Sequence, residues 1–228
     1  MQAIDFAYEI LDIFYENDAE IYLAGGSVRD YLLYGDFDDF DFATPCTPHV
    51  VTTLLDLEKY DKYSFKFGTV KAVYDEVEVQ ITTFRKEDKY LDFRHPSSIK
   101  FVKDIEIDSL RRDFTINALY LDYSGKILDF HQGLKDLENR IIRTIGDPSS
   151  KIKEDPTRIL RAFRFMLKLD FDMDEGLKQA IKDNKDLLSL ISKERFKMEY
   201  KKMLEHSSKE DIENLFNSFD FNLENYLV

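Results

Sequence analysis

The chain has 228 residues, a formal net charge of −13 and a single cysteine, Cys46. A chain of this length can bury a core without disulfides, and its acidic balance disfavours indiscriminate binding to nucleic acid while still allowing a local basic groove. No apolar run reaches the length of a membrane span, and no basic patch precedes a long apolar stretch at the N-terminus, so the sequence predicts a soluble, cytoplasmic protein with no membrane partner.

The first part of the chain alternates between helical and strand patterns. Apolar residues recur at helical spacing over residues 3–16, which predicts an amphipathic opening helix. This alternation predicts an α+β fold around a small mixed β-sheet. Further helices are predicted over residues 28–34, 47–57 and 108–113, and strands over residues 21–24, 38–43, 67–74, 77–84 and 115–122.

The second part of the chain has a different pattern. After a turn signal at residues 122–125 and a short strand over residues 126–130, the pattern becomes wholly helical. A composition switch near residues 146–150 marks the expected boundary, so we expect two domains, residues 1–146 and residues 147–228. The predicted helices of the second part cover residues 133–139, 154–168, 174–183, 186–191, 193–205 and 208–217.

Two adjacent glycines, Gly25 and Gly26, follow the first predicted strand. They let the chain turn sharply and expose backbone N–H groups where the next helix begins, with the positive end of its dipole outward. Ser27 suits the N-cap of that helix, and Arg29 adds a positive charge. The pattern indicates a backbone site for an anion, although a double glycine by itself is more often only a turn.

Two aspartates, Asp39 and Asp41, follow in an alternating segment. At this spacing their side chains project from one face of a strand, while Phe40 and Phe42 point into the core. Two carboxylates on one face can hold hard cations such as Mg²⁺, the metal predicted here, with Mn²⁺ as an alternative. A solvated strand edge is the structural alternative for this motif.

Five segments resemble, in order, the motifs of the class II CCA-adding enzyme and bacterial poly(A) polymerase family. The resemblance covers nearly the whole chain. It implies a nucleotidyltransferase head that carries catalysis, and an all-helical neck that selects the nucleotide. The implied activity is the addition of CCA to the tRNA 3′ end from CTP and ATP, without a nucleic-acid template and with release of pyrophosphate. The five segments are residues 23–30, 38–44, 67–70, 111–118 and 154–165.

The resemblance implies roles for residues in the head. Asp39 and Asp41 would hold two metal ions, and the backbone around Gly25, Gly26 and Ser27 would contact the triphosphate, with Arg29 as a fixed positive charge. Asp30 is expected to orient Arg29 or to cap locally, and Arg112 is the better site candidate of its segment.

The head departs from the family at one position. Members of the family often carry a third acidic residue where this chain has Gln80, which cannot supply an anionic ligand. Glu78 lies two residues earlier on the same strand face and is a candidate substitute.

The neck carries the implied amino-acid template for C and A. Asp155 and Arg158 would pair with the Watson–Crick edge of the base, and Arg161 and Arg164 would face the nucleotide or tie neck to head. An exposed intrahelical salt-bridge ladder is the structural alternative. Arg195 and Glu199, in the last neck motif, are expected to be structural.

Several functional alternatives stay open at this point. Residues 86–96 resemble a flexible loop that CCA-adding and A-adding members keep, which makes CC-only addition less favoured. Addition of A alone to tRNA or another RNA is the runner-up, and a catalytically weak RNA-binding relic is the third hypothesis. The chain also stops soon after the neck, where the family continues into body and tail domains. We therefore expect either a minimal enzyme or a fragment, with a second protomer or a partner protein completing the grip on tRNA.

Overall fold

The computed structural model describes residues 2–87 and 98–227, which form two compact units. The first unit contains the described residues up to 134, and the second contains residues 135–227. The units divide earlier in the chain than the expected boundary at residue 146, because strand β9 (Ile141–Ile142) pairs in parallel with β10 (Asp172–Met173). The assignment of catalysis to one domain and nucleotide selection to the other stays a prediction.

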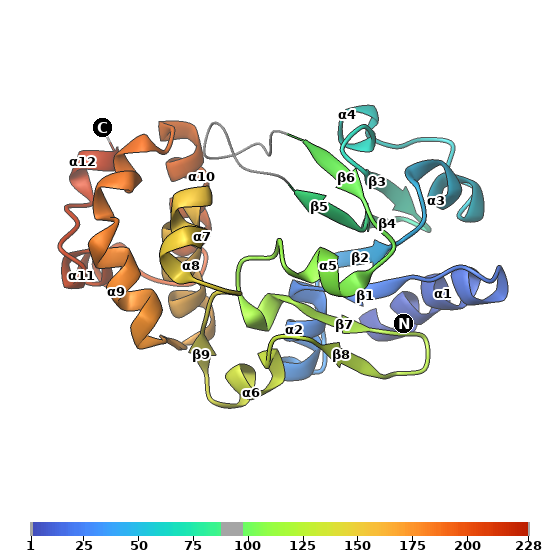
Figure 1. The fold of residues 1–228 in the computed structure, drawn as a ribbon, viewed down its shortest axis with the longest axis horizontal. Coiled ribbons are helices and arrows are strands. Elements are labelled where there is room, and N and C mark those ends of the chain that lie inside the picture. Colours follow the sequence, from blue (N-terminus) through green and yellow to red (C-terminus); the bar gives the residue numbers. More distant parts are fainter. Residues whose placement is uncertain (1, 88–97, 228) are drawn as a thin grey trace. The chain divides into compact units, whose positions relative to one another are not determined.

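A six-stranded mixed sheet organises the first unit, in the order β3-β4-β2-β1-β7-β8 (Figure 1). The β2 and β4 strands run parallel, and the other neighbouring strands of this sheet are antiparallel. The predicted α+β fold with a small mixed sheet is therefore confirmed. The six strands are β1 (Tyr22–Ala24), β2 (Phe40–Thr44), β3 (Thr69–Tyr74), β4 (Val77–Thr83), β7 (Leu119–Leu121) and β8 (Ile127–Asp129).

Helices cover the sheet because their apolar faces need burial. Helix α1 buries Phe6, Ile10, Leu11 and Phe14 in the main core of this unit, and its start is closed by a capping box between Gln2 and Asp5. The other helices of the unit are α2 (Gly26–Tyr34), α3 (Pro48–Leu54), α4 (Lys62–Phe65) and α5 (Ile105–Ser109), and α1 spans Ala3–Glu16.

Two predicted elements of the first unit are wrong in detail. The helix predicted over residues 108–113 lies instead at α5, because Asp104 caps it by accepting a hydrogen bond from the Glu106 amide at 2.8 Å. The strand predicted over residues 115–122 is reduced to β7. A 3-10 helix occupies Thr115–Asn117. All residues of this segment are buried, and a continuously buried run fits a buried helical turn as well as a strand.

A two-stranded ribbon of β5 (Arg85–Glu87) and β6 (Ile99–Phe101) completes the first unit. The family-like loop expected over residues 86–96 lies outside the described residues except for its first two, which belong to β5. Throughout the part of the chain that the structure covers, no helix has both the length and the apolar character that crossing a membrane requires.

The second unit is mainly helical, and the short β9–β10 pair corrects the prediction of a wholly helical region. Aromatic rings fill its core, where Phe163 contacts Phe216, Phe219 and Phe221 with ring centroids 5.0 to 5.9 Å apart. Its helices are α6 (Gly133–Glu138, which begins in the first unit), α7 (Pro148–Glu154), α8 (Thr157–Leu169), α9 (Glu175–Asp183), a 3-10 helix (Lys185–Leu190), α10 (Lys193–Leu204), α11 (Lys209–Ser218) and α12 (Glu224–Leu227).

The helix predicted over residues 154–168 begins three residues later, at Thr157, as α8, and Glu154 is instead the last residue of α7. The break comes at Asp155, which has an extended backbone with φ −145° and ψ 100°, and at Pro156, which is the N-cap of α8. A residue before proline is disfavoured in the helical region, and proline has no N–H to continue a helix. Asp155 is therefore not on the same helix as Arg158, as the predicted row required.

Candidate active site

Gly25 forms the turn between β1 and α2. Its backbone has φ 70° and ψ −127°, a conformation that side-chain-bearing residues rarely adopt. A Cβ atom at this position would also lie 2.9 Å from Nη1 of Arg112. Glycine therefore lets the chain enter α2 sharply and lets an arginine approach the backbone there. The first backbone N–H groups of α2 come directly after Gly25, at the positive end of the helix dipole.

Ser27 is not the N-cap of α2, as the sequence suggested, because the helix begins at Gly26 and its cap is Gly25. The Ser27 side chain is buried, and its hydroxyl donates a hydrogen bond to the Asp39 carbonyl oxygen at 2.6 Å. The same hydroxyl accepts a hydrogen bond from the Asp41 backbone N–H at 3.1 Å. Ser27 thus ties the start of α2 to both residues of the aspartate pair.

The two aspartates lie at the start of β2. Asp39 is exposed and immediately precedes the strand, and Asp41 is half-buried as its second residue. Burial, followed by the negative charge of Asp39, raises the pKa of Asp41. A divalent cation would relieve both the desolvation and the repulsion, so the chemistry of these carboxylates fits one.

Gln80 is the direct neighbour of Asp41 across the β2–β4 pair. Its side-chain amide donates a hydrogen bond to Oδ1 of Asp41 at 2.9 Å. The amide therefore occupies the place where an acidic residue would add a third carboxylate. Within residues 2–87 and 98–227 no three acidic, histidine or cysteine side chains gather to hold a metal, so Glu78 does not complete such a cluster here.

Arg29 places a buried positive charge behind the glycine turn. Its Nε and Nη2 atoms each lie 2.7 Å from Oδ1 of Asp30, which confirms the predicted orienting role of that aspartate. Its Nη1 atom donates to Oδ1 of Asn117 at 2.6 Å. Arg112 donates to the backbone carbonyl of the same asparagine at 3.2 Å. Two arginines from distant parts of the sequence therefore converge beside Gly25.

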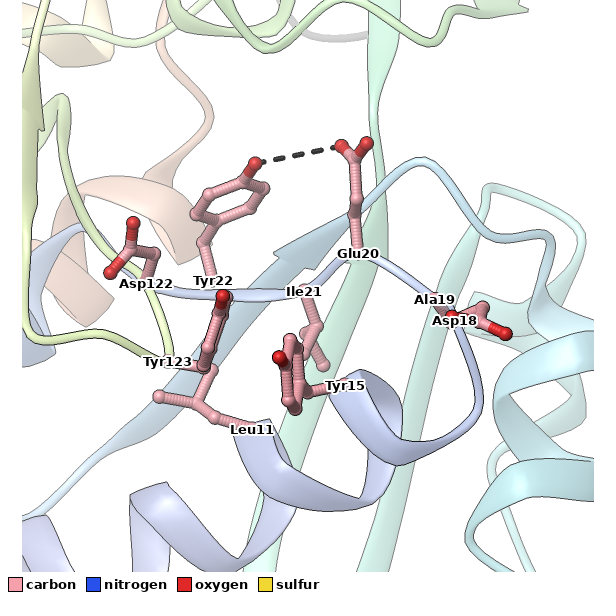
Figure 2. A pocket seen from close by; sticks show the side chains of 9 residues that line it. All are labelled: Leu11, Tyr15, Asp18, Ala19, Glu20, Ile21, Tyr22, Asp122 and Tyr123. Carbon is pink, nitrogen blue, oxygen red and sulfur yellow. Dashed lines mark hydrogen bonds between the residues drawn. The ribbon is translucent and has the colours of Figure 1, made fainter.

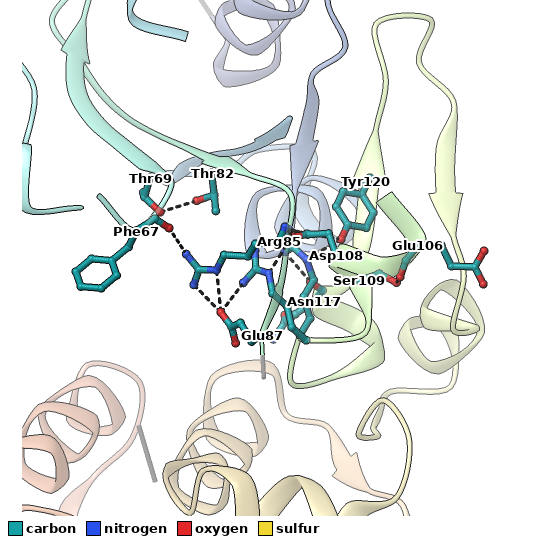
Figure 3. Close-up of polar contacts among 12 residues, drawn as sticks. Phe67, Thr69, Thr82, Arg85, Glu87, Glu106, Asp108, Ser109, Asn117 and Tyr120 are labelled. Atoms are coloured by element: carbon teal, nitrogen blue, oxygen red, sulfur yellow. Dashed lines mark hydrogen bonds and ion pairs between the residues drawn. The ribbon is translucent and has the colours of Figure 1, made fainter. Parts of the chain in front are cut away.

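Two residues that the sequence did not single out, Asp108 and Tyr120, hold Arg112. Figure 3 shows these two side chains close together. Arg112 Nε donates to the Tyr120 hydroxyl at 2.9 Å, and that hydroxyl donates to Oδ2 of Asp108 at 3.1 Å. Burial raises the pKa of Tyr120 to about 12, so the phenol keeps its proton at neutral pH. The spacing of Asp108 with Arg111 and Arg112, at i+3 and i+4, was the available signal.

Asp108 is fully buried but charged. Burial alone would raise its pKa, yet Arg111 and Arg112 outweigh burial and hold that pKa below its ordinary value. Its Oδ1 atom also accepts a hydrogen bond from the Arg85 backbone N–H at 3.1 Å, at the first residue of β5. This carboxylate therefore joins β5 to Arg111 and Arg112, whose side chains lie 2.8 and 3.7 Å from it. Figure 3 shows Asp108 beside Arg85.

The other predicted site residues lie in the second unit. Oδ1 of Asp155 accepts hydrogen bonds from the Thr157 amide at 3.0 Å and hydroxyl at 2.6 Å, and Arg195 approaches both carboxylate oxygens at 3.3 Å. Arg158 is buried and donates to Glu154 at 2.8 Å and to the Lys151 carbonyl at 2.6 Å. Asp155 and Arg158 therefore contact other residues, and they do not form the exposed intrahelical salt-bridge ladder that was the structural alternative.

Arg161 and Arg164 share one aromatic neighbour on α8. Both guanidinium groups lie over the ring of Phe165, at 5.6 and 4.8 Å from its centroid. Nε of Arg164 also lies 3.4 Å from Oε2 of Glu199 on α10. Arg195 therefore contacts Asp155, and Glu199 contacts Arg164. These contacts agree with the structural role expected of Arg195 and Glu199.

Comparison with known proteins tests the resemblance. Residues 21–143 match the model of the poly A polymerase head domain, more than half of the chain. The chain belongs to this family. Residues 170–217 match a second model, described as the probable RNA and SrmB-binding site of polymerase A. The predicted family, and with it the class of nucleotidyltransferases, is confirmed.

Curated relatives and solved structures agree with this assignment. CCA-adding enzymes of Streptococcus gordonii and a Geobacillus species are 44% and 41% identical over 81% and 87% of this chain, covering 46% and 49% of their own lengths. The crystal structure of the Bacillus stearothermophilus CCA-adding enzyme in complex with CTP matches all of this chain with a TM-score of 0.86 and 33% identity, covering 54% of that chain. The Thermotoga maritima CCA-adding enzyme complexed with tRNA matches 95% of this chain with a TM-score of 0.75 and 27% identity, covering 50% of that chain. The chain thus spans about half the length of these relatives.

Proposed function

We propose that the chain transfers nucleotides from CTP and ATP to the 3′ end of tRNA, building CCA without a nucleic-acid template and releasing pyrophosphate. The observation that carries this proposal is the Ser27 hydroxyl, which joins the start of α2 to the backbone of Asp39 and Asp41. These hydrogen bonds support the proposal because they hold the glycine turn and the carboxylate pair together within one unit. The matched relatives named above are CCA-adding enzymes.

In the proposed reaction the RNA 3′-hydroxyl oxygen attacks the α-phosphorus of the nucleotide. A new bond forms between this oxygen and the α-phosphorus, and the bond between the α-phosphorus and the oxygen that links it to the β-phosphate breaks. Pyrophosphate leaves, and the hydroxyl proton passes to solvent. The Gly25 N–H donates to the Leu119 carbonyl at 3.0 Å, so the turn at Gly25 would serve the triphosphate by presenting the N–H groups that begin α2 at Gly26. Arg29 and Arg112 would supply positive charge. Mg²⁺ or Mn²⁺ held by the aspartate pair would lower the pKa of the hydroxyl and neutralise the leaving phosphates.

Nucleotide selection is assigned to the second unit. Asp155 offers acceptors and Arg158 offers donors, the groups that a complementary base edge requires. The contacts of Asp155 with Thr157 and Arg195 support this role, because they fix the carboxylate before a base arrives. Arg161 and Arg164 are proposed to bind the nucleotide from the same helix. The predicted second protomer or partner protein stays a prediction.

The test is incorporation of labelled CTP and ATP on three RNAs: tRNA lacking CCA, tRNA ending in CC, and an RNA unrelated to tRNA. Addition of C, C and A to the first, and of A alone to the second, supports the proposal. Addition of A only, on the second tRNA or on any RNA, would instead identify an A-adding enzyme. Binding of tRNA with no incorporation, in either Mg²⁺ or Mn²⁺, would identify the catalytically weak relic.

A further inference from the structure

The first unit has a pocket whose lining does not include the aspartate pair. It has a volume of about 250 Å³ and lies between the end of α1, the start of β1 and the turn after β7 (Figure 2). A pocket this small is below the usual size of a site for a whole drug-sized ligand, so it suits a single side chain or a small molecule rather than a nucleotide. Its lining includes Tyr15, Tyr22, Tyr123, Asp18, Glu20 and Asp122.

Aromatic rings form much of the pocket wall. Tyr15 and Tyr123 stack with ring centroids 3.9 Å apart and planes at 21°, although these side chains come from α1 and from a turn more than a hundred residues later. They are 54% and 46% exposed, so each pair member keeps surface open to solvent. Tyr22 rests on Phe84 with a centroid distance of 6.1 Å, which fixes a third ring. The walls are therefore preformed.

The charge of the lining is one-sided. Asp18, Glu20 and Asp122 carry carboxylates, and no lysine, arginine or histidine is among the residues that line the described pocket. The Tyr22 hydroxyl lies 3.5 Å from Oε2 of Glu20, which places that carboxylate beside an aromatic ring (Figure 2). Aromatic faces and carboxylates both attract cations, whereas a phosphate would be repelled.

We propose that this pocket binds the side chain of an arginine carried by a partner protein. A guanidinium is planar, so it can stack on a tyrosine face while its N–H groups donate to a carboxylate in the same plane. Lysine lacks both the flat face and the fork. Glu20 is the main carboxylate partner, because Oδ1 of Asp122 already accepts hydrogen bonds from the turn that carries Tyr123.

The test uses N-acetyl-L-arginine amide as the probe and the whole chain, observed through its isotope-labelled tyrosine rings. We expect saturable shifts confined to the rings of Tyr15, Tyr22 and Tyr123, with a dissociation constant on the order of 1 mM. Substituting Glu20→Gln should weaken binding about tenfold, since a charge-assisted hydrogen bond is lost. Glu16→Gln is the matched control, because it removes the same charge from a neighbouring exposed residue outside the pocket lining.

Any of the following would overturn the proposal: no saturable shift, equal weakening by the control, equal binding of N-acetyl-L-lysine amide, or equal binding of the uncharged citrulline analogue. Tighter binding of spermidine would also overturn it, by identifying a polyamine site. The measurement needs no nucleotide incorporation, so its result is independent of the proposed transferase activity.

Discussion

Replacing Ser27 with alanine should disturb the position of the aspartate pair without changing either carboxylate. The change removes a buried hydroxyl that donates to the Asp39 carbonyl at 2.6 Å and accepts from the Asp41 amide at 3.1 Å. An orphaned buried polar group costs about 1–3 kcal/mol. The Asp39 side is exposed and water can replace that hydrogen bond, so we expect the free energy of unfolding to fall by about 1–3 kcal/mol in total.

The effect on catalysis should be larger than the effect on stability implies. The variant keeps both aspartate carboxylates, but the backbone that positions them loses its hydrogen bonds to α2. A displacement on the order of 1 Å at a reacting centre can cost about 100-fold in rate. We expect kcat for CTP incorporation to fall roughly 10- to 100-fold, with a higher Mg²⁺ concentration needed for half-maximal activity. Single-turnover incorporation across a Mg²⁺ titration measures both quantities.

Thr44→Val is the matched control for this substitution. The Thr44 hydroxyl also joins two backbone groups, donating to the Glu20 carbonyl at 2.5 Å and accepting from the Cys46 amide at 3.1 Å. Thr44 is buried and lies on β2, as Asp41 does, but alternation along the strand turns its side chain to the opposite face. The control should lose similar stability and keep its Mg²⁺ dependence. If Ser27→Ala behaves in the same way, Ser27 does not position the aspartates.

Three further substitutions test the candidate site. Asp41→Asn should lower incorporation at least about 100-fold without unfolding the chain, because a metal-binding charge is lost at nearly constant volume; wild-type turnover in Mg²⁺ would contradict the metal role. Gln80→Glu should lower the Mg²⁺ concentration needed for activity, since it adds a carboxylate beside Asp41; unchanged Mg²⁺ titrations would show that this position does not face the metal. Asp155→Ala should change the preference between CTP and ATP more than it changes the melting temperature, and an unchanged preference would return this residue to a structural role.

The charge of Asp108 predicts how stability depends on pH. Its folded pKa is lowered, so its stabilising contribution is fully present above the unfolded value near 3.9 and is lost as pH falls through the folded pKa. Asp108→Asn should therefore destabilise the chain at pH 7 by about 1.5–3 kcal/mol and flatten the decline of stability below pH 4. Denaturant unfolding of both proteins from pH 2.5 to 7 measures this, and parallel pH profiles would refute the assignment.

Local sequence patterns determined much of the fold. Helical apolar spacing placed α1, and the paired glycines placed the sharp turn into α2, because periodicity and backbone freedom are properties of short segments. Alternation also placed Asp41 in a strand. The same reasoning was wrong at Asp155, because helical apolar spacing predicted a continuous helix there although Pro156 favours a helix boundary.

Only the tertiary structure decided what these residues touch. Ser27 looked like a helix cap, yet its hydroxyl lies against the backbone of residues 12 and 14 positions away in the sequence. From the sequence, Gln80 indicated only that an acidic metal ligand is absent. The parallel register of β2 with β4 makes Gln80 a hydrogen-bond donor to Asp41. Sequence spacing predicts neighbours within one helix or strand, because their geometry repeats. Contacts between elements depend on register and packing across the whole unit, which no short segment contains.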